Sequence, residues 1–449
     1  MKSTLSTVCA AGSLLIAMSS AWSQEEPMID PSQLSVTAPG PVVKAMQAAN
    51  LNGGVRLSPS MRTSSSIVAP TLKTFNYSVV SPRDGQTYTG SIVGADPRAN
   101  GARTTAVEIV LIPIRIAFTG TVRTFDPTQP DPGCLGPTPS ATDTAMKQVL
   151  GSPLLNPVPN YTINGENIGN VTFPDAFQRA QFWRTSIGGP LVSVKPAYHL
   201  ALSPVTVMPV QTISMANNTA GSGATYSLSA AGTCSTHLAS DVNPPRLAVV
   251  DINFMDAQLN TIIANLNLNA AQLPFFVTYG TVMSEGPPGT LSNNCCILGY
   301  HSTVTSTPTP TNFGQSYGIS NYFQNAGKNG VFTGLSDGVT MAHEILEWVN
   351  DPSGMNLTPQ WGNIGQVGGC LTTGTGTDAG QNNLEVGDPL SGNNMPGVMM
   401  PNGITYKLQE LAFFDWFMGN VAFQAAGNKY SSNGTFGGFA KPCPPGGTN

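Results

Sequence analysis

One stretch constrains the fold of this chain more than any other. Residues 337–352 read DGVTMAHEILEWVNDP. Asp337 is a residue type that favours the N-cap, and Pro352 cannot continue a helix, so the stretch predicts a helix of about three turns. Its apolar residues form two stripes, and a helix that is apolar on two sides is usually buried. The remaining arc contains Thr340, His343, Glu344, Glu347 and Asp351.

The polar arc of this helix predicts a metal-binding or catalytic site. Burying a carboxylate costs several kcal/mol unless the group is paired or binds a metal. His343 and Glu347 are four residues apart, so their side chains project side by side and can hold one ion. The side chain of Glu344 would lie next to that ion. The alternative is an ordinary solvated face that is rich in glutamate.

The N-terminus has the pattern of an export signal. Lys2 supplies the charged start, residues 5–18 form the apolar run, and Ala21-Trp22-Ser23 is a small-x-small cleavage site, so residues 1–23 are expected to be removed. The apolar run is too short to span a membrane stably, and no other stretch is long and apolar enough to do so. We therefore expect a secreted or periplasmic protein without a membrane span.

The composition argues against a nucleic-acid partner and favours a strand-rich fold. The 449 residues carry a formal net charge of -5, and only 10% of them are charged. The absence of a basic patch argues against nucleic-acid binding. The 48 glycines and 37 prolines predict many turns and a strand-rich chain, and the 40% hydrophobic content suffices for a core.

The cysteine count favours disulfides. Six of the 7 cysteines lie beyond the export signal, and an even number in an exported chain favours disulfides over thiolate metal sites. The sequence does not choose among the pairings. We expect Cys295 and Cys296 to pair with different partners, because a bridge between neighbours strains the backbone.

The chain divides into three expected regions: the signal 1–23, a flexible or weakly structured region 24–103, and a folded domain 104–449. Asp84-Gly85 indicates a hairpin within the second region. Residues 107–116 give the strongest strand signal, and Pro113 suggests a bulge or a strand end there. Strand, helix and strand over 246–253, 256–266 and 274–281 predict a crossover unit over a mixed sheet.

Other expected elements complete the domain. Residues 353–402 form a turn-rich segment that is too long for a plain loop, which makes it a candidate functional segment. We further predict helices over 141–150, 175–184 and 405–424, the last rich in aromatic residues, and strands over 201–215, 297–304 and 315–323.

A hydrolytic metal site needs a third protein ligand and an open water position. Glu385 and Asp388 compete for this role, because both lie in a turn punctuated by glycine. His301 is the other candidate, and both His301 and Tyr300 are possible ligands or neighbours of the ligands. In a catalytic site Glu344 would be the general base, and Tyr300, His301 and Tyr317 are candidates for stabilising the oxyanion.

Rival chemistries have weaker support. Two stretches, around Ser316 and Ser336, match the pattern of a serine-hydrolase elbow, but only His343 follows either serine, so a loop or turn is favoured. A glycosidase could use Glu344 and Asp388, but any exported protein offers acid pairs.

The motif HEILE resembles the active-site helix of zincin metallopeptidases in an HExxE form, with glutamate in place of the second histidine. Together with NNLEVGDP, YKLQELAFFDWF and YSSNGTF it is similar to a family of exported bacterial proteins. The Gly299-Tyr300-His301 strand adds a more remote similarity to plant EXORDIUM-like, phosphate-induced secreted proteins. The resemblance covers about the last third of the chain. The positions that it carries over are His301, His343, Glu344, Glu347, Glu385 and Asp388.

The resemblance implies an α+β, zincin-like fold, with a mixed twisted sheet packed on the active-site helix and on the aromatic C-terminal helix, and with many long loops. It also implies that the last strand of the sheet lies beside the active-site helix and holds an extended peptide. The expected function is that of a secreted metal-dependent hydrolase, a peptidase with one Zn²⁺, acting as a monomer on an extracellular peptide or protein. The alternative is a non-catalytic secreted or surface protein with a structural metal site or a degenerate zincin fold.

Overall fold

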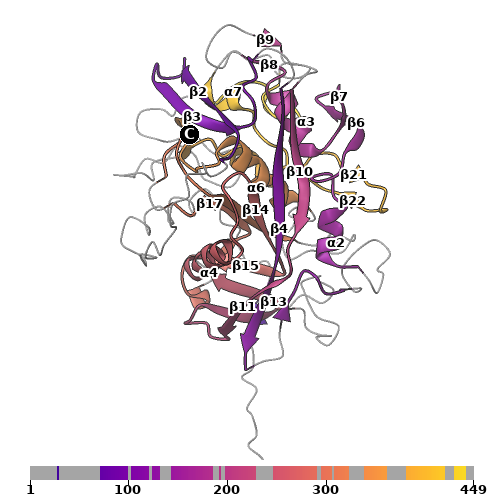
Figure 1. Cartoon of the computed structure of the whole chain (residues 1–449), viewed down its shortest axis with the longest axis vertical. Coiled ribbons are helices and arrows are strands. Elements are labelled where there is room, and N and C mark those ends of the chain that lie inside the picture. The colour runs from indigo at the N-terminus through magenta and orange to yellow at the C-terminus, as the bar shows by residue number, and fades with distance from the viewer. Residues whose placement is uncertain are drawn as a thin grey trace, which may run out of the picture.

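The fold is a mixture of strands and helices in which strands predominate, which confirms the α+β class. Two long strands run along the molecule in Figure 1, with the helices grouped around them. The computed structural model describes residues 28–29, 71–99, 103–120, 124–131, 143–185, 192–193, 198–228, 246–290, 295–305, 308–322, 338–361, 381–419 and 429–440.

A seven-stranded sheet forms the centre. Its main path runs β10 (Tyr198–Val207), β4 (Arg103–Thr119), β14 (Leu273–Tyr279), β18 (Ser316–Tyr322) and β17 (Gly299–Thr303), and β5 (Thr124–Phe125) and β11 (Gln211–Ala216) also pair with β4. The strands from β10 to β18 are parallel to their neighbours on this path, whereas β17 is antiparallel to β18 and ends it. This mixed sheet agrees with the coarse expectation from the sequence.

Strand β4 separates two hydrophobic cores because successive side chains of a strand point to opposite faces. Val107, Ile109 and Leu111 belong to the core that contains the 339–350 helix, which we call the α6 core. Val110 and Ile112 belong to the core on the other face, which contains the 252–265 helix and which we call the α4 core.

Pro113 does not end β4. The neighbour of the strand changes there instead, because β10 pairs with β4 up to Leu111 and β11 pairs with it from Ile114 onwards. A proline has no N–H group to donate to a neighbouring strand, so a position between two partners suits it.

A second sheet has the order β1 (Met28–Ile29), β12 (Gly223–Leu228), β13 (Arg246–Asp251), β15 (Thr281–Ser284) and β16 (Cys295–Ile297). The expected crossover unit is thus divided between two sheets. Helix α4 (Ile252–Asn265) follows β13, but β14 pairs within the central sheet, and only its continuation β15 runs parallel to β13. Gly280, at φ 57°, lies between β14 and β15, at the bend from one sheet into the other.

The remaining helices contribute to the α6 core. They are α2 (Ala145–Leu150), α3 (Phe173–Gln181), α6 (Val339–Asn350) and α7 (Phe414–Met418), and two 3₁₀ turns, η2 (Pro288–Thr290) and η3 (Asp388–Leu390), lie in loops. Helix α6 packs against β18 and β17. Its expected N-cap residue, Asp337, lies outside the described residues, and Gly338 occupies the cap position.

Among the described residues, five antiparallel pairs of strands lie outside the two larger sheets. They are β2–β3 (Thr74–Val80, Thr87–Val93), β6–β7 (Val158–Ile163, Glu166–Val171), β8–β9 (Arg184–Thr185, Val192–Ser193), β19–β20 (Leu357–Trp361, Gln381–Asn383) and β21–β22 (Val398–Met399, Thr405–Tyr406). The β2–β3 turn contains the predicted Asp84-Gly85 pair. This hairpin is part of the α6 core, and Asn356 ties it to the end of α6 by bonding both the N–H and the carbonyl of Ser91. The hydrophobic core therefore already includes residues that precede Thr104.

The long C-terminal helix predicted over 405–424 is wrong in the described part of that range. Residues 405–406 lie in β22, and only Phe414–Met418 are helical. The backbone amides of Glu410, Ala412 and Phe413 bond to carbonyls of Asn393, Val386 and Tyr430 instead of to the preceding helical turn. Long-range backbone pairing has therefore replaced the helix that the aromatic periodicity indicated.

The expectation that Cys295 and Cys296 bond to different partners is also wrong. The two neighbours form a disulfide with each other at the start of β16, where both are buried. The strain expected of a bridge between neighbours made this pairing unexpected from the sequence. Cys134, Cys234, Cys370 and Cys443 lie outside the described residues.

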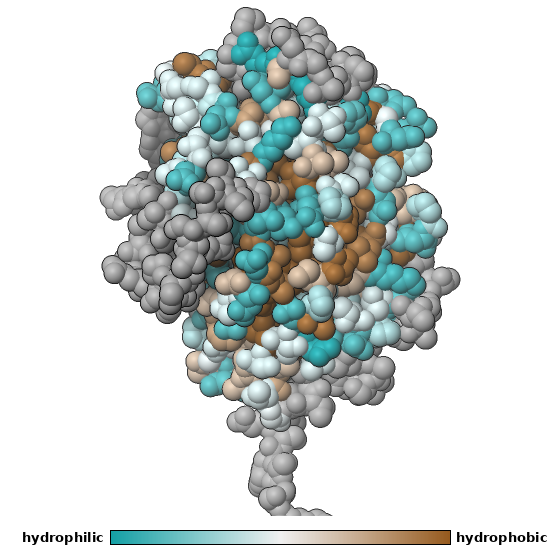
Figure 2. Space-filling view, viewed as in Figure 1, coloured by the Kyte–Doolittle hydropathy of each residue, from teal (hydrophilic) through white to brown (hydrophobic). Residues whose placement is uncertain are grey.

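The surface is varied. On the face seen in Figure 2, apolar side chains gather in the middle of the molecule, and hydrophilic side chains border them. Within the described parts of the chain, no helix has the length and apolar character needed to cross a bilayer.

Candidate metal centre

The polar arc of α6 is buried, as predicted. His343 is 4% exposed, Glu344 0% and Glu347 1%. The helix begins at Val339 and ends at Asn350, before Pro352, and its apolar residues fill the α6 core on the other sides. The fold therefore holds a histidine and two carboxylates inside the protein, away from water.

Two further segments converge on this arc. The loop that leads into η3 brings Glu385 and Asp388, and the antiparallel strand β17 brings His301. All three side chains are buried, none more than 1% exposed. Residues that are far apart in the sequence thus form one cluster of two imidazoles and four carboxylates.

The first ligand group combines His343, Glu347 and Asp388. The Nε2 atom of His343 lies 3.0 Å from Glu347 Oε2 and 3.5 Å from Asp388 Oδ1. Ligands bound tetrahedrally to zinc at its usual bond lengths are about 3.3–3.5 Å apart. The two separations are close to that value, so this donor set fits a zinc-sized ion with little movement.

Gln409 and Gly387 set the orientation of this group. Gln409 Nε2 donates to the Gly387 carbonyl at 2.5 Å, which turns Gln409 Oε1 towards His343 Nδ1 at 3.0 Å. Nδ1 must then carry the proton, which leaves the lone pair on Nε2, facing the two carboxylates. The Gly387 N–H donates to Glu347 Oε1 at 3.1 Å and leaves Oε2 directed at His343.

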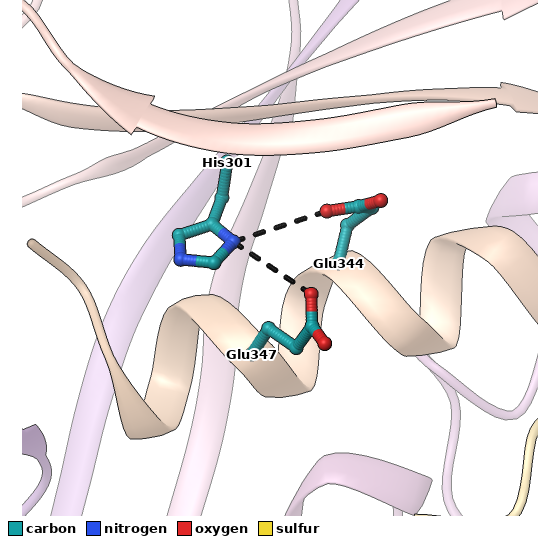
Figure 3. Close-up of side chains that lie close together, drawn as sticks. All are labelled: His301, Glu344 and Glu347. Atoms are coloured by element: carbon teal, nitrogen blue, oxygen red, sulfur yellow. Dashed lines mark ion pairs between the residues drawn. The ribbon is translucent and has the colours of Figure 1, made fainter. Parts of the chain in front are cut away.

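The second ligand group combines His301, Glu344 and Glu347. His301 Nδ1 lies 3.9 Å from Glu344 Oε2 and 3.9 Å from Glu347 Oε2 (Figure 3). The other ring nitrogen, Nε2, donates to the carbonyl of Asp351 at 3.0 Å. Glu385 Oε2 lies 4.0 Å from that Nε2. Glu347 therefore stands between the two imidazoles.

Several polar atoms of the cluster have no hydrogen-bond partner. They are Nδ1 of His301 and both carboxylate oxygens of Glu344 and of Glu385. A buried polar atom without a partner costs on the order of 1–3 kcal/mol, and more when it is charged. Lone pairs that converge in a buried space are the arrangement that a bound cation satisfies.

The charges of the cluster shift the pKa values of its members. Burial alone would lower the pKa of His343, but the charges of Glu347, Glu344 and Asp388 outweigh it and raise the pKa to about 10. Burial, together with the charge of Glu347, raises the pKa of Glu385 and of Asp388 well above the ordinary range. Burial likewise raises the pKa of Glu344. Without a cation, the cluster therefore retains protons that a divalent ion would displace.

Tyr300 does not join the cluster. It neighbours His301 in β17, so its side chain points to the opposite face of the sheet, where its hydroxyl donates to Asp256 at 3.3 Å. Tyr317 donates to the same Asp256 oxygen. The expectation that these tyrosines stand near the metal or the oxyanion is therefore wrong, because strand alternation separates them from His301.

Asp351, which belongs to the predicted polar arc, is also not part of either ligand group. Its carboxylate accepts from Ser353 Oγ and from the N–H groups of Met355 and Asn356, so it organises the loop after α6. Of the other two histidines, His199 pairs with Asp175 at 2.8 Å, and His237 lies outside the described residues.

The roles of three residues of the centre were not predicted from the sequence. Gln409 orients His343, and two glycines allow close approach. A Cβ atom at Gly387 would lie 2.7 Å from His343 Cγ, and one at Gly299 would lie 2.8 Å from Glu344 Cγ. The glycines around Asp388 suggested a close backbone approach in general terms, but nothing in the sequence distinguishes Gln409 from any other glutamine.

No protein-family model, curated protein or solved structure matches this chain. The resemblance to zincins therefore rests on the HExxE motif and its surroundings alone. Function has to be argued from the chemistry of the cluster.

Proposed function

We propose that this chain is an exported metal-dependent hydrolase that cleaves peptide bonds. His343, Glu347 and Asp388 would hold one divalent ion, with zinc as the expected metal, and Glu344 would act as the general base. The ion would supply a Lewis acid that lowers the pKa of a water molecule. Glu344 would accept a proton from the attacking water and return it to the leaving amine.

The observation that carries this proposal is the state of Glu344. Its carboxylate is completely buried, neither oxygen has a hydrogen-bond partner, and it follows the ligand His343 directly on α6. Purely structural carboxylates are normally satisfied by donors, as Glu410 is by Ser431 and Thr435. A carboxylate kept free beside a metal-type ligand group is suited to accepting a proton.

The edge of the central sheet supports a peptide as the substrate. Among the described strands, β17 pairs only with β18, and it carries His301 into the cluster. An exposed strand edge binds an extended peptide through main-chain hydrogen bonds. A peptide aligned with β17 would place its backbone near the ligand groups.

Burial of the centre supports the alternative, a non-catalytic exported protein with a structural metal. The six ionisable side chains of the cluster are at most 4% exposed. Two cavities of about 410 and 600 Å³ are lined by other parts of the chain, around Arg83 and around Asn160. A closed site with all its positions filled by protein is typical of structural metal sites.

A Glu344→Gln variant separates the two functions. When each protein is loaded with one equivalent of zinc, the metal content, measured by elemental analysis, should be the same as in the wild type, because Glu344 is not a ligand of the first group. Cleavage of a mixed peptide library, followed by mass spectrometry, should fall about 10²–10⁴-fold, the usual contribution of a general base. Glu108→Gln, on β4 and bonded to Thr206 and Gln272, is the matched control and should leave cleavage intact.

Two outcomes would contradict the hydrolase. A wild-type protein that binds metal and cleaves no member of the library would favour the structural alternative. Protein that binds no zinc after dialysis against it would remove the basis of both functions.

A further inference from the structure

We propose that the centre has a second cation position, formed by His301 Nδ1, Glu344 and Glu347, and that a divalent ion bound there inhibits the hydrolase. This inference rests on the proposed function, because it assigns a second use to the general base Glu344. The two positions share Glu347.

The second position is a built site. His301, Glu344 and Glu347 come from β17 and α6 and point towards one another in Figure 3. All three are at most 1% exposed, and His301 Nδ1 and both oxygens of Glu344 have no hydrogen-bond partner. An imidazole nitrogen and two carboxylate oxygens form a donor set that suits zinc or manganese.

His301 is held in the state that a ligand requires. Its Nε2 donates a proton to the Asp351 carbonyl at 3.0 Å, so the lone pair is on Nδ1, the atom that faces the carboxylates. Asp351 is itself fixed, because its side chain accepts hydrogen bonds from three groups of the loop that follows α6. The orientation of His301 is therefore defined without any bound ion.

With every carboxylate ionised, the cluster has enough negative charge for two divalent ions. Glu344, Glu347, Glu385 and Asp388 are buried together, and the two imidazoles are neutral when each donates one proton to a protein acceptor. One divalent ion balances two of the four carboxylates. The other two must then hold either protons or a second cation, because an unpaired buried charge is costly. A second divalent ion balances them.

One oxygen links the two positions. Glu347 Oε2 lies 3.0 Å from His343 Nε2 and 3.9 Å from His301 Nδ1, while Oε1 accepts from the Gly387 N–H. Two ions that share this oxygen would be roughly 3.5–4 Å apart, as in two-metal sites. The wider separations around His301 predict that the second ion binds more weakly than the first.

The consequence for the reaction follows from Glu344. A carboxylate that coordinates a cation is a weaker base, because the positive charge lowers its affinity for the proton that it would accept from water. Filling the first position should therefore activate the protein, and filling the second should inhibit it. Activity should pass through a maximum as the concentration of free metal rises.

The test measures Mn²⁺ binding instead of turnover. Apoprotein without an affinity tag is titrated with Mn²⁺ by calorimetry, and the bound ions are examined by electron paramagnetic resonance. Wild-type protein should bind two ions, and the second should reduce the signal of the first because adjacent Mn²⁺ ions couple magnetically. His301→Ala and Glu344→Gln should each bind one ion with an uncoupled signal.

Controls keep each outcome decisive. His199→Ala removes a histidine that pairs with Asp175 outside the cluster and should leave two coupled ions. Circular dichroism checks folding, and Glu344→Gln, which preserves side-chain size, decides the matter if His301→Ala does not fold. Wild-type protein with one ion overturns the second position alone, and protein with none overturns the proposed function as well. Two uncoupled ions, or two ions retained in Glu344→Gln, place the second ion elsewhere and overturn the inference.

Discussion

Gln409 determines which nitrogen of His343 is available to a metal, although it touches no ion itself. Its amide is held by the Gly387 carbonyl, and its oxygen accepts the proton of His343 Nδ1. Residues that orient a ligand in this way typically contribute 10–100-fold to metal affinity. At the scale of single residues, the centre therefore depends on a side chain outside the ligand set.

Gln409→Met should weaken zinc binding by about 10–100-fold, because it removes the acceptor that fixes the imidazole while keeping a side chain of similar length. Calorimetric titration with zinc measures the change. Gln148→Met is the matched control, since Gln148 is also buried but bonds to Tyr322 and lies outside the cluster. Equal zinc affinity for the two variants would show that Gln409 does not orient the ligand.

Asp256 supplies a prediction on pH, on the other face of the sheet. Burial outweighs the hydrogen bonds from Tyr317 and Tyr300 and raises the pKa of Asp256 to about 6. The folded state thus favours the protonated acid, so the stabilisation is complete below about pH 4, near the ordinary pKa, and is lost as the pH rises through 6. Asp256→Asn should remove this contribution, on the order of 1–3 kcal/mol.

The measurement is the fall in the free energy of unfolding between pH 4 and pH 7.5, compared between wild-type protein and Asp256→Asn. The fall should be smaller in the variant. An identical pH dependence in both proteins would mean that Asp256 is not the group responsible.

At the scale of elements, α6 is the component on which the centre is built. Leu346 is completely buried in the α6 core and is not one of the proposed ligands. Leu346→Ala should lower the free energy of unfolding by roughly 2–5 kcal/mol, as truncations in a packed core do. Denaturant unfolding provides the measurement. Leu357→Ala, at a position that is 47% exposed, should change stability by no more than about half a kcal/mol.

The sequence could predict α6 because its evidence is local. Two apolar stripes and a polar arc at helical spacing, ended by Pro352, determine both the helix and its burial. The central strand around Ile109 was predictable for the same reason. The approach of His301 and Asp388 to α6 could only be suggested, because it depends on strand order and loop geometry that no local pattern encodes.

Elements that depend on distant partners were predicted poorly. The aromatic segment after Tyr406 has helical periodicity, yet most of its described backbone bonds to other loops, as Ala412 does to Val386. The bridge between Cys295 and Cys296 depends on a strand conformation that cysteine counting cannot supply. In each case tertiary contacts overrode the local preference.

At the scale of the whole molecule, export remains a prediction. Mature protein recovered from outside the cytoplasm should begin at residue 24, after the small-x-small site at Ala21 to Ser23. Its intact mass should also show that all six remaining cysteines are oxidised, since disulfides persist in exported proteins. A mass that includes residues 1–23, or free thiols at all six cysteines, would contradict this expectation.

The path of β4 through the middle of the molecule has a mechanical consequence. Its side chains alternate between the α6 core and the α4 core, so one backbone belongs to both. If either side came apart, β4 would lose its packing there and its hydrogen bonds to β10 or β11 would be strained together. We therefore expect the parts of the chain on the two sides of β4 to unfold together. A force or a protease that opens the face around Asp256 should also release the ligands on the opposite face.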